Sequence, residues 1–226
     1  MRKIIVIILI TLTAGFPAHV YGVETAEQQP PPEISAQTAI MIEANSGEEL
    51  YEKNPDQKAY PASITKIMTA LLAIENGDLD KKVKVSGNAA GVEGSSIYLE
   101  AGEMITLRDL VYGLMLRSGN DAAIAIAEEI GGSVDNFVMM MNKRARELGA
   151  CNTHFANPNG LHNPEHYTTA RDMALISMAA MKNPEFKKVA GVKSCAVPLV
   201  KPPHRRYAAG GLAGQYRLKP LTTSHV

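Results

Sequence analysis

A serine and a lysine stand three residues apart in the segment Ser63-Ile64-Thr65-Lys66. In a helix this spacing places both side chains on one face. The Ser63 hydroxyl can then act as a nucleophile near the positive end of the helix dipole, which stabilises a developing anion. Lys66 can accept the hydroxyl proton only if its pKa is depressed, and burial in an apolar helix favours that depression. The structural alternative is that Ser63 caps a helix and Lys66 extends to the surface.

A second polar segment, Ser118-Gly119-Asn120, follows further along the chain. Its hydroxyl can relay a proton, and the amide of Asn120 offers both a donor and an acceptor to a substrate amide. Read alone, the same three residues also suit a turn that caps a helix.

The segments around these motifs are predicted to be mostly helical. Residues 63–76 are apolar and rich in helix formers, begin just after Pro61, and end at Asn76-Gly77, which suits a left-handed helix cap. Thr106-Leu107-Arg108-Asp109 has the form of a capping box that opens a helix to about residue 116. Later helices are predicted over residues 122–130, 134–148 and 169–181. Ser118-Gly119-Asn120 is therefore expected between two helices.

Strands are predicted mainly near the start of the chain. Residues 38–43 and 49–53 flank Asn45-Ser46-Gly47, whose turn residues favour a β-hairpin. A lysine-rich strand at 82–86 leads into a glycine-rich loop at 87–96, and residues 152–166 are predicted as a further loop. Beyond residue 186 the pattern decays, with at most one strand at 194–200.

Together the two motifs resemble the serine acyl-transferase set of penicillin-binding proteins and class A β-lactamases. Four segments are similar to the low-molecular-weight D-alanyl-D-alanine carboxypeptidases, namely residues 60–69, 115–122, 155–161 and 166–174. This resemblance covers roughly residues 36–188. It implies an α+β fold of the β-lactamase/transpeptidase type, in which an antiparallel sheet is covered by a helical subdomain.

The resemblance also implies a reaction. Ser63 is acylated by the terminal D-Ala-D-Ala amide of a peptidoglycan stem peptide, D-alanine leaves, and water hydrolyses the acyl-enzyme. In that scheme Lys66 is the general base, Ser118 passes the proton to the leaving amine, and Asn120 orients the stem peptide and holds Lys66. β-Lactam antibiotics act as slowly deacylating inhibitors. No cofactor is implied.

The third motif of the family, a Lys-Thr-Gly, is absent from the sequence. Its lysine would bind the substrate carboxylate and help to depress the pKa of Lys66. Its strand would supply the second oxyanion donor, and losing one such donor costs about 10²–10³ in rate. Because residues 191–226 diverge from the strands expected there, we expect the last sheet strands to be missing and hypothesise a truncated or frameshifted gene product.

Two other functions stay open. The first alternative is a catalytically dead or non-catalytic fragment that binds peptidoglycan, and the second is a class A-like β-lactamase. The β-lactamase hypothesis is disfavoured because no Glu-x-x-Leu-Asn follows Ser118-Gly119-Asn120 to position a deacylating water.

The length of 226 residues and the 46% apolar content suit one globular domain. Arg2 and Lys3 precede an apolar run that exits at Val20-Tyr21-Gly22, which is typical of a secretory signal peptide, with an uncleaved anchor as the alternative. We therefore predict a signal peptide at 1–22, a proline-rich linker at 23–35, an incomplete catalytic domain at 36–190 and a divergent tail at 191–226. The expected location is the bacterial cell envelope, in the periplasm or at the outer face of the cytoplasmic membrane, without a membrane anchor after cleavage.

Charge and metal-ligand patterns exclude other classes. The 23 basic and 23 acidic residues balance, so no nucleic-acid partner is expected. None of the six histidines falls into a metal-ligand spacing, so no metal is expected. Cys151 and Cys195 would reach a compartment that permits disulfides, and the sequence leaves open whether they pair.

Overall fold

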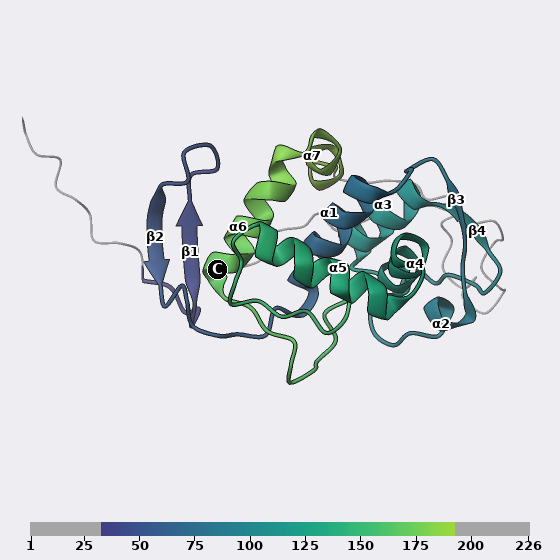
Figure 1. Cartoon of the computed structure of the whole chain (residues 1–226), viewed down its shortest axis with the longest axis horizontal. Helices are drawn as coiled ribbons and strands as arrows, with labels where there is room; N and C mark the ends of the chain where they lie inside the picture. The colour runs from purple at the N-terminus through teal and green to yellow at the C-terminus, as the bar shows by residue number, and fades with distance from the viewer. Residues whose placement is uncertain (1–32, 193–226) are drawn as a thin grey trace, which may run out of the picture. The chain divides into compact units, whose positions relative to one another are not determined.

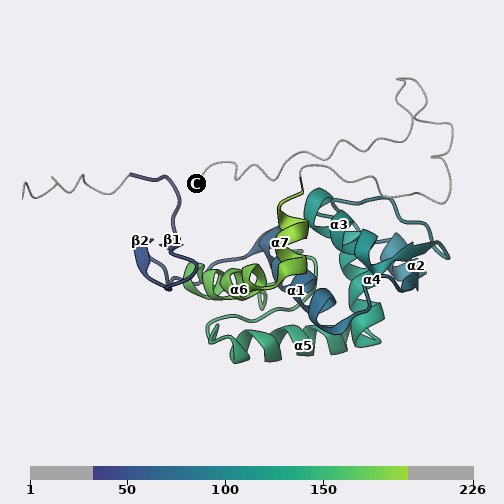
Figure 2. The same ribbon diagram turned by 90° about the horizontal axis from the view of Figure 1, so that it is seen from above.

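The computed structural model describes residues 33–192 (Figures 1 and 2). The predicted signal peptide, most of the predicted linker and the predicted strand at 194–200 lie outside these residues. Cys151 is exposed and free among the described residues, whereas Cys195 lies outside them, so the disulfide stays a prediction.

The core is built around one central helix, α1 (Lys66–Asn76). Its side chains Met68 and Leu71 are fully buried. The helices that contact it are α3 (Leu107–Arg117), α4 (Asn120–Gly131), α5 (Val134–Glu147), α6 (Ala170–Lys182) and α7 (Pro184–Ala190). Because Lys66 is the first residue of α1, the packing of this helix fixes where the candidate base lies.

Within residues 33–192, two small antiparallel sheets accompany the helices. Strands β1 (Ala39–Ile42) and β2 (Glu49–Lys53) pair with Ala39 opposite Lys53, which confirms the predicted hairpin. Strands β3 (Lys82–Lys84) and β4 (Met104–Thr106) form the second sheet. Strand β4 was not predicted, because three residues are too few to show an alternating pattern. The hairpin lies beside α6, whereas β3 lies near α4 (Figure 1).

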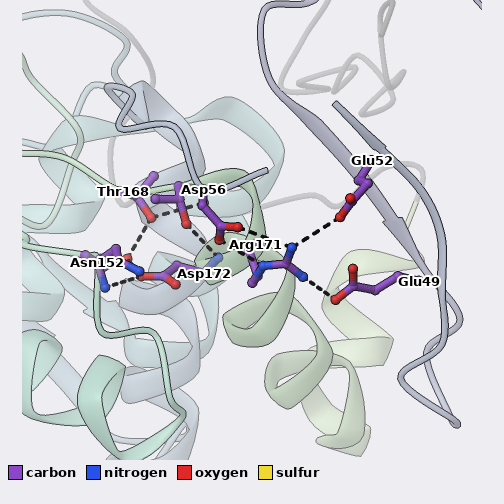
Figure 3. Close-up of polar contacts among 9 residues, drawn as sticks. Glu49, Glu52, Asp56, Asn152, Thr168, Arg171 and Asp172 are labelled. Carbon is purple, nitrogen blue, oxygen red and sulfur yellow. Dashed lines mark hydrogen bonds and ion pairs between the residues drawn. The ribbon is translucent and has the colours of Figure 1, made fainter. Parts of the chain in front are cut away.

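The hairpin is joined to α6 by Arg171, which lies in the first turn of that helix. Figure 3 shows its guanidinium pointing towards carboxylates of β2 and of the segment that follows it. It donates to Asp56 Oδ1 over 2.8 Å, contacts Glu52 Oε2 at 3.2 Å, and pairs with Glu49. The next residue, Asp172, is buried and accepts from the Asn152 N–H over 2.8 Å. Adjacent residues of α6 therefore bind the hairpin and the 152–166 loop.

The predicted helix starts at 106 and 169 are confirmed by their caps. Thr106 accepts a hydrogen bond from the Asp109 N–H, and Thr169 accepts one from the Asp172 N–H. Ser133 caps α5 in the same way through the Asn136 N–H. These local side-chain bonds satisfy backbone donors that a helix start leaves unpaired.

Several predicted boundaries were wrong. Residues 63–76 are not one α-helix, because a 3-10 helix, η1 (Ala62–Thr65), precedes α1. Helix α4 begins at Asn120, two residues earlier than predicted. The predicted glycine-rich loop contains a one-turn helix, α2 (Gly87–Ala90), whose cap is Ser86. Helix α7 was missed, although Asn183 caps it and a proline occupies its first turn.

Gly77 is extended (φ −110°, ψ 153°) rather than left-handed, so its predicted role was wrong. A Cβ at this position would collide with Leu107 Cδ2 and lie 2.7 Å from Ile130 Cδ1 and 2.8 Å from the Ala73 carbonyl oxygen. The glycine is therefore needed for space, not for its φ angle.

We expect Gly77→Ala to lower the free energy of unfolding by about 1–3 kcal/mol, the usual cost of overpacking. Urea unfolding followed by circular dichroism measures it. Gly87→Ala is the matched control, because a Cβ there meets nothing within 4 Å. Equal midpoints for both variants would contradict the steric explanation.

Candidate active site

Ser63 and Lys66 lie at the junction of η1 and α1. Ser63 is exposed within η1, whereas Lys66 is only 3% exposed. The Lys66 Nζ donates to Asn120 Oδ1 over 2.8 Å and to the Asn159 carbonyl oxygen over 2.5 Å. Ser63 Oγ lies 3.4 Å from the same Nζ atom. The predicted pair is thus together, and two further acceptors surround the amine.

The environment of Lys66 changes its acid–base behaviour. Burial lowers the pKa of Lys66 to about 8, and the negative charge of Asp121 opposes part of this shift. A neutral lysine amine has two N–H groups and one lone pair. Since Asn120 Oδ1 and the Asn159 carbonyl can take both N–H groups, the lone pair is left for the Ser63 hydroxyl. The arrangement therefore suits proton transfer from Ser63 to Lys66.

The segment Ser118-Gly119-Asn120 joins α3 to α4. Ser118 ends α3 with a left-handed backbone (φ +56°), and Asn120 is the buried first residue of α4. The Asn120 Nδ2 donates to the Glu93 carbonyl oxygen over 2.8 Å, which turns its Oδ1 towards Lys66. The Ser118 hydroxyl makes no hydrogen bond to another residue within 33–192, so no direct bond joins it to the Ser63–Lys66 pair.

Asp121 stabilises the same turn from the inside. The residue is 1% exposed. Its carboxylate accepts from Ser96 Oγ over 2.6 Å and from the backbone N–H groups of Ile97, Leu99 and Ala122 over 2.9–3.1 Å. The 96–99 segment is therefore fixed to the start of α4, where Asn120 lies.

A loop from the second half of the chain closes the other side of the Ser63–Lys66 turn. Besides the Asn159 carbonyl, the Pro158 carbonyl accepts from Thr69 Oγ1 over 2.6 Å. Gly160 has φ +83°, and a Cβ there would collide with the carbonyl group of Ala62. The Ala62 backbone itself has a positive φ of +47°, which is uncommon for a residue other than glycine. The loop and the turn therefore pack backbone against backbone.

Comparison with known proteins identifies the family of this chain. Residues 23–200 match the family model described as "Peptidase_S11: D-alanyl-D-alanine carboxypeptidase". This chain belongs to the D-alanyl-D-alanine carboxypeptidase family. The D-alanyl-D-alanine carboxypeptidase DacF of Bacillus subtilis (strain 168) is 45% identical over 161 residues, a match that covers 69% of this chain and 41% of DacF.

Solved structures give the same assignment. A D-alanyl-D-alanine carboxypeptidase from Mycobacterium tuberculosis H37Rv superposes with a TM-score of 0.74 at 35% identity, covering 77% of this chain and 66% of that one. Penicillin binding protein 5 from Haemophilus influenzae gives 0.70 at 38% identity, covering 74% and 52%. The predicted α+β, penicillin-binding type of fold is thus confirmed. The match spans less than half the length of DacF.

For this member of the D-alanyl-D-alanine carboxypeptidase family, the structure brings three of the four predicted site residues together, namely Ser63, Lys66 and Asn120. Their catalytic roles, and that of Ser118, stay predictions. Sequence reasoning missed the Asn159 carbonyl and the Asp121 carboxylate. A backbone carbonyl carries no residue-type signal, and Asp121 has no sequence signal beyond its place in the family-like segment 115–122. All helices within residues 33–192 are too short or too polar to span a bilayer.

Proposed function

We propose that the protein is a serine D-alanyl-D-alanine carboxypeptidase that removes the terminal D-alanine from peptidoglycan stem peptides. The observation that carries this proposal is the position of Lys66 Nζ, with Ser63 Oγ at 3.4 Å and carbonyl-type acceptors at 2.8 and 2.5 Å. Burial also supports the proposal, because it lowers the pKa of Lys66 to about 8 and so increases the fraction of neutral amine near neutral pH.

In the proposed reaction, Ser63 Oγ attacks the carbonyl carbon of the penultimate D-alanine while Lys66 takes the hydroxyl proton. The C–N bond then breaks, and the leaving amine of D-alanine receives a proton by way of Ser118. Water hydrolyses the resulting ester and restores the Ser63 hydroxyl. Asn120 holds Lys66 and orients the stem peptide. A penicillin would acylate Ser63 through its strained amide and leave slowly.

The proposed location is the bacterial cell envelope, reached through the predicted signal peptide at 1–22. An exported enzyme would meet peptidoglycan stem peptides outside the cytoplasm. β-Lactam antibiotics reach the same compartment and are the proposed inhibitors.

A non-catalytic protein that binds peptidoglycan is the second candidate. The observation in its favour is the lack of a Lys-Thr-Gly in the sequence. The family motif would supply an oxyanion donor worth about 10²–10³ in rate, as well as a cation for the substrate carboxylate. Membership of the family therefore does not by itself establish that this chain is active.

The test combines a substrate and an inhibitor. The purified protein is incubated with a peptide that ends in D-Ala-D-Ala, and mass spectrometry detects the loss of one alanine. In parallel, a fluorescent penicillin is added and intact mass detects a covalent adduct. We expect both products, and Ser63→Ala is the control that should yield neither.

The other outcomes select the alternatives. A protein that is folded by circular dichroism, takes no label and releases no D-alanine would contradict the proposal and favour the non-catalytic candidate. Rapid hydrolysis of nitrocefin without a trapped adduct would favour a β-lactamase.

A further inference from the structure

His166 is a buried imidazole that bonds to both segments flanking the Ser63–Lys66 turn. It is 2% exposed and precedes α6. Its Nε2 lies 2.8 Å from Thr65 Oγ1, and its Nδ1 lies 3.0 Å from the Ala156 backbone nitrogen. One ring therefore contacts two parts of the chain that lie far apart in sequence.

The partners of His166 fix its protonation state. The Ala156 N–H can only donate, so Nδ1 must be the acceptor. The single proton of the neutral ring is then on Nε2, which donates to Thr65 Oγ1. Burial lowers the pKa of His166 to about 4, with a smaller contribution from His154. The edge-to-face contact with Phe155, at 5.7 Å between ring centroids, also holds the ring plane.

Both bonded segments hold groups that surround Lys66. Thr65 is fully buried and lies in η1 between Ser63 and Lys66. Ala156 begins the loop whose Asn159 carbonyl accepts from Lys66 over 2.5 Å. A change in the distance between the two segments would therefore change the contacts of the lysine amine.

We propose that His166 is a positioning residue for acyl transfer, which ties the Ser63–Lys66 turn to the 156–160 loop through its Nε2–H donor and its Nδ1 acceptor. This inference rests on the proposed function. The role requires one donor and one acceptor on a neutral side chain, and it does not require a histidine. Glutamine offers both groups and no charge, whereas leucine offers neither.

The variants His166→Gln and His166→Leu separate this role from simple core filling. We expect His166→Leu to lower the second-order rate constant for acylation by a fluorescent penicillin about tenfold or more, because two buried groups lose their partner. His166→Gln should stay within about threefold of the wild-type protein, since it restores both bonds. Thr65→Val removes the hydroxyl that accepts from His166 at nearly constant volume, and it should reproduce the loss of acylation rate. This variant also serves as the test if His166→Leu does not fold.

The control for lost stability is Ser133→Ala, which removes the α5 cap and touches neither segment. It should acylate at the wild-type rate. If His166→Gln is as slow as His166→Leu, or if both match the wild-type protein, the proposal is wrong.

Two spectroscopic readouts keep this test independent of the proposed activity. ¹⁵N NMR should report a neutral His166 with its proton on Nε2 at pH 7, and the Nδ1–H tautomer or an imidazolium would overturn the assignment. NMR titration of the Lys66 amine should show a pKa that moves in His166→Leu and returns in His166→Gln. A wild-type protein that takes no penicillin but shows the Nε2–H tautomer and the shifting Lys66 pKa would contradict the proposed activity while supporting the contact by which His166 positions Lys66. A Lys66 pKa that does not move in His166→Leu would overturn the positioning role.

Discussion

Replacing Lys66 with Met is expected to slow the acylation of Ser63 by penicillin by roughly 10²–10⁴-fold, the usual contribution of a positioned general base. Methionine fills a similar volume and suits the buried environment of α1, so the fold should survive. It cannot accept the Ser63 proton, and the Asn120 Oδ1 and Asn159 carbonyl lose their common donor. The loss should therefore appear in the rate of covalent labelling, followed by intact mass over time.

Lys84→Met is the matched control, because Lys84 is exposed on β3. It should label at the wild-type rate. A Lys66→Met rate within about threefold of the wild-type rate would show that another group takes the proton, since general-base removal costs far more than that.

The pH dependence of the same rate tests the protonation state of Lys66. Burial lowers the pKa of its amine to about 8. Only the neutral amine can accept a proton, so the acylation rate should rise with pH up to about 8 and level off above it. A rate that falls with pH over this range would contradict a lysine base. In Lys66→Met this inflection should be absent.

The sequence predicted those features of the fold that depend on neighbouring residues. The hairpin around Gly47 and the caps at Thr106 and Thr169 are local, because a turn glycine or a threonine hydroxyl acts on backbone groups a few residues away. The pairing of Ser63 with Lys66 was predictable for the same reason, since a spacing of three residues brings side chains together in a helical segment.

The features that could not be predicted depend on contacts between distant segments. The 3-10 turn at Ser63 lies against the 156–160 loop, and nothing near Ala62 in the sequence indicates its positive φ. The Asn159 carbonyl became a partner of Lys66 through tertiary packing alone, because every residue has such a group. Gly77 resembled a helix cap, and the space that requires a glycine there is limited mainly by side chains of the distant helices α3 and α4, together with the nearby Ala73 carbonyl.

Replacing Gly160 with Ala should have the largest effect of any single added methyl group at the site. A Cβ there would collide with the Ala62 carbonyl, immediately before Ser63. The left-handed backbone, with φ +83°, adds about 1–3 kcal/mol of strain, and overpacking adds about 1–3 kcal/mol more. The loop must move away, and the Asn159 carbonyl moves with it. Because a misplacement of about 1 Å can cost about 10²-fold in rate, we expect a loss of that order in penicillin acylation, together with a lower unfolding midpoint.

Gly102→Ala is the matched control, because comparing it with Gly160→Ala separates the cost of backbone strain from the effect of the collision at the active site. Gly102 has φ +85°, nearly the same as Gly160, but a Cβ there meets nothing within 4 Å. It should therefore carry the backbone strain without the collision, so its unfolding midpoint should fall while its acylation rate stays near that of the wild-type protein. If Gly160→Ala and Gly102→Ala lose stability equally and both acylate normally, the 156–160 loop does not set the position of Ser63. If only Gly160→Ala loses acylation, the contact between the Gly160 and Ala62 backbones holds the nucleophile in place against Lys66.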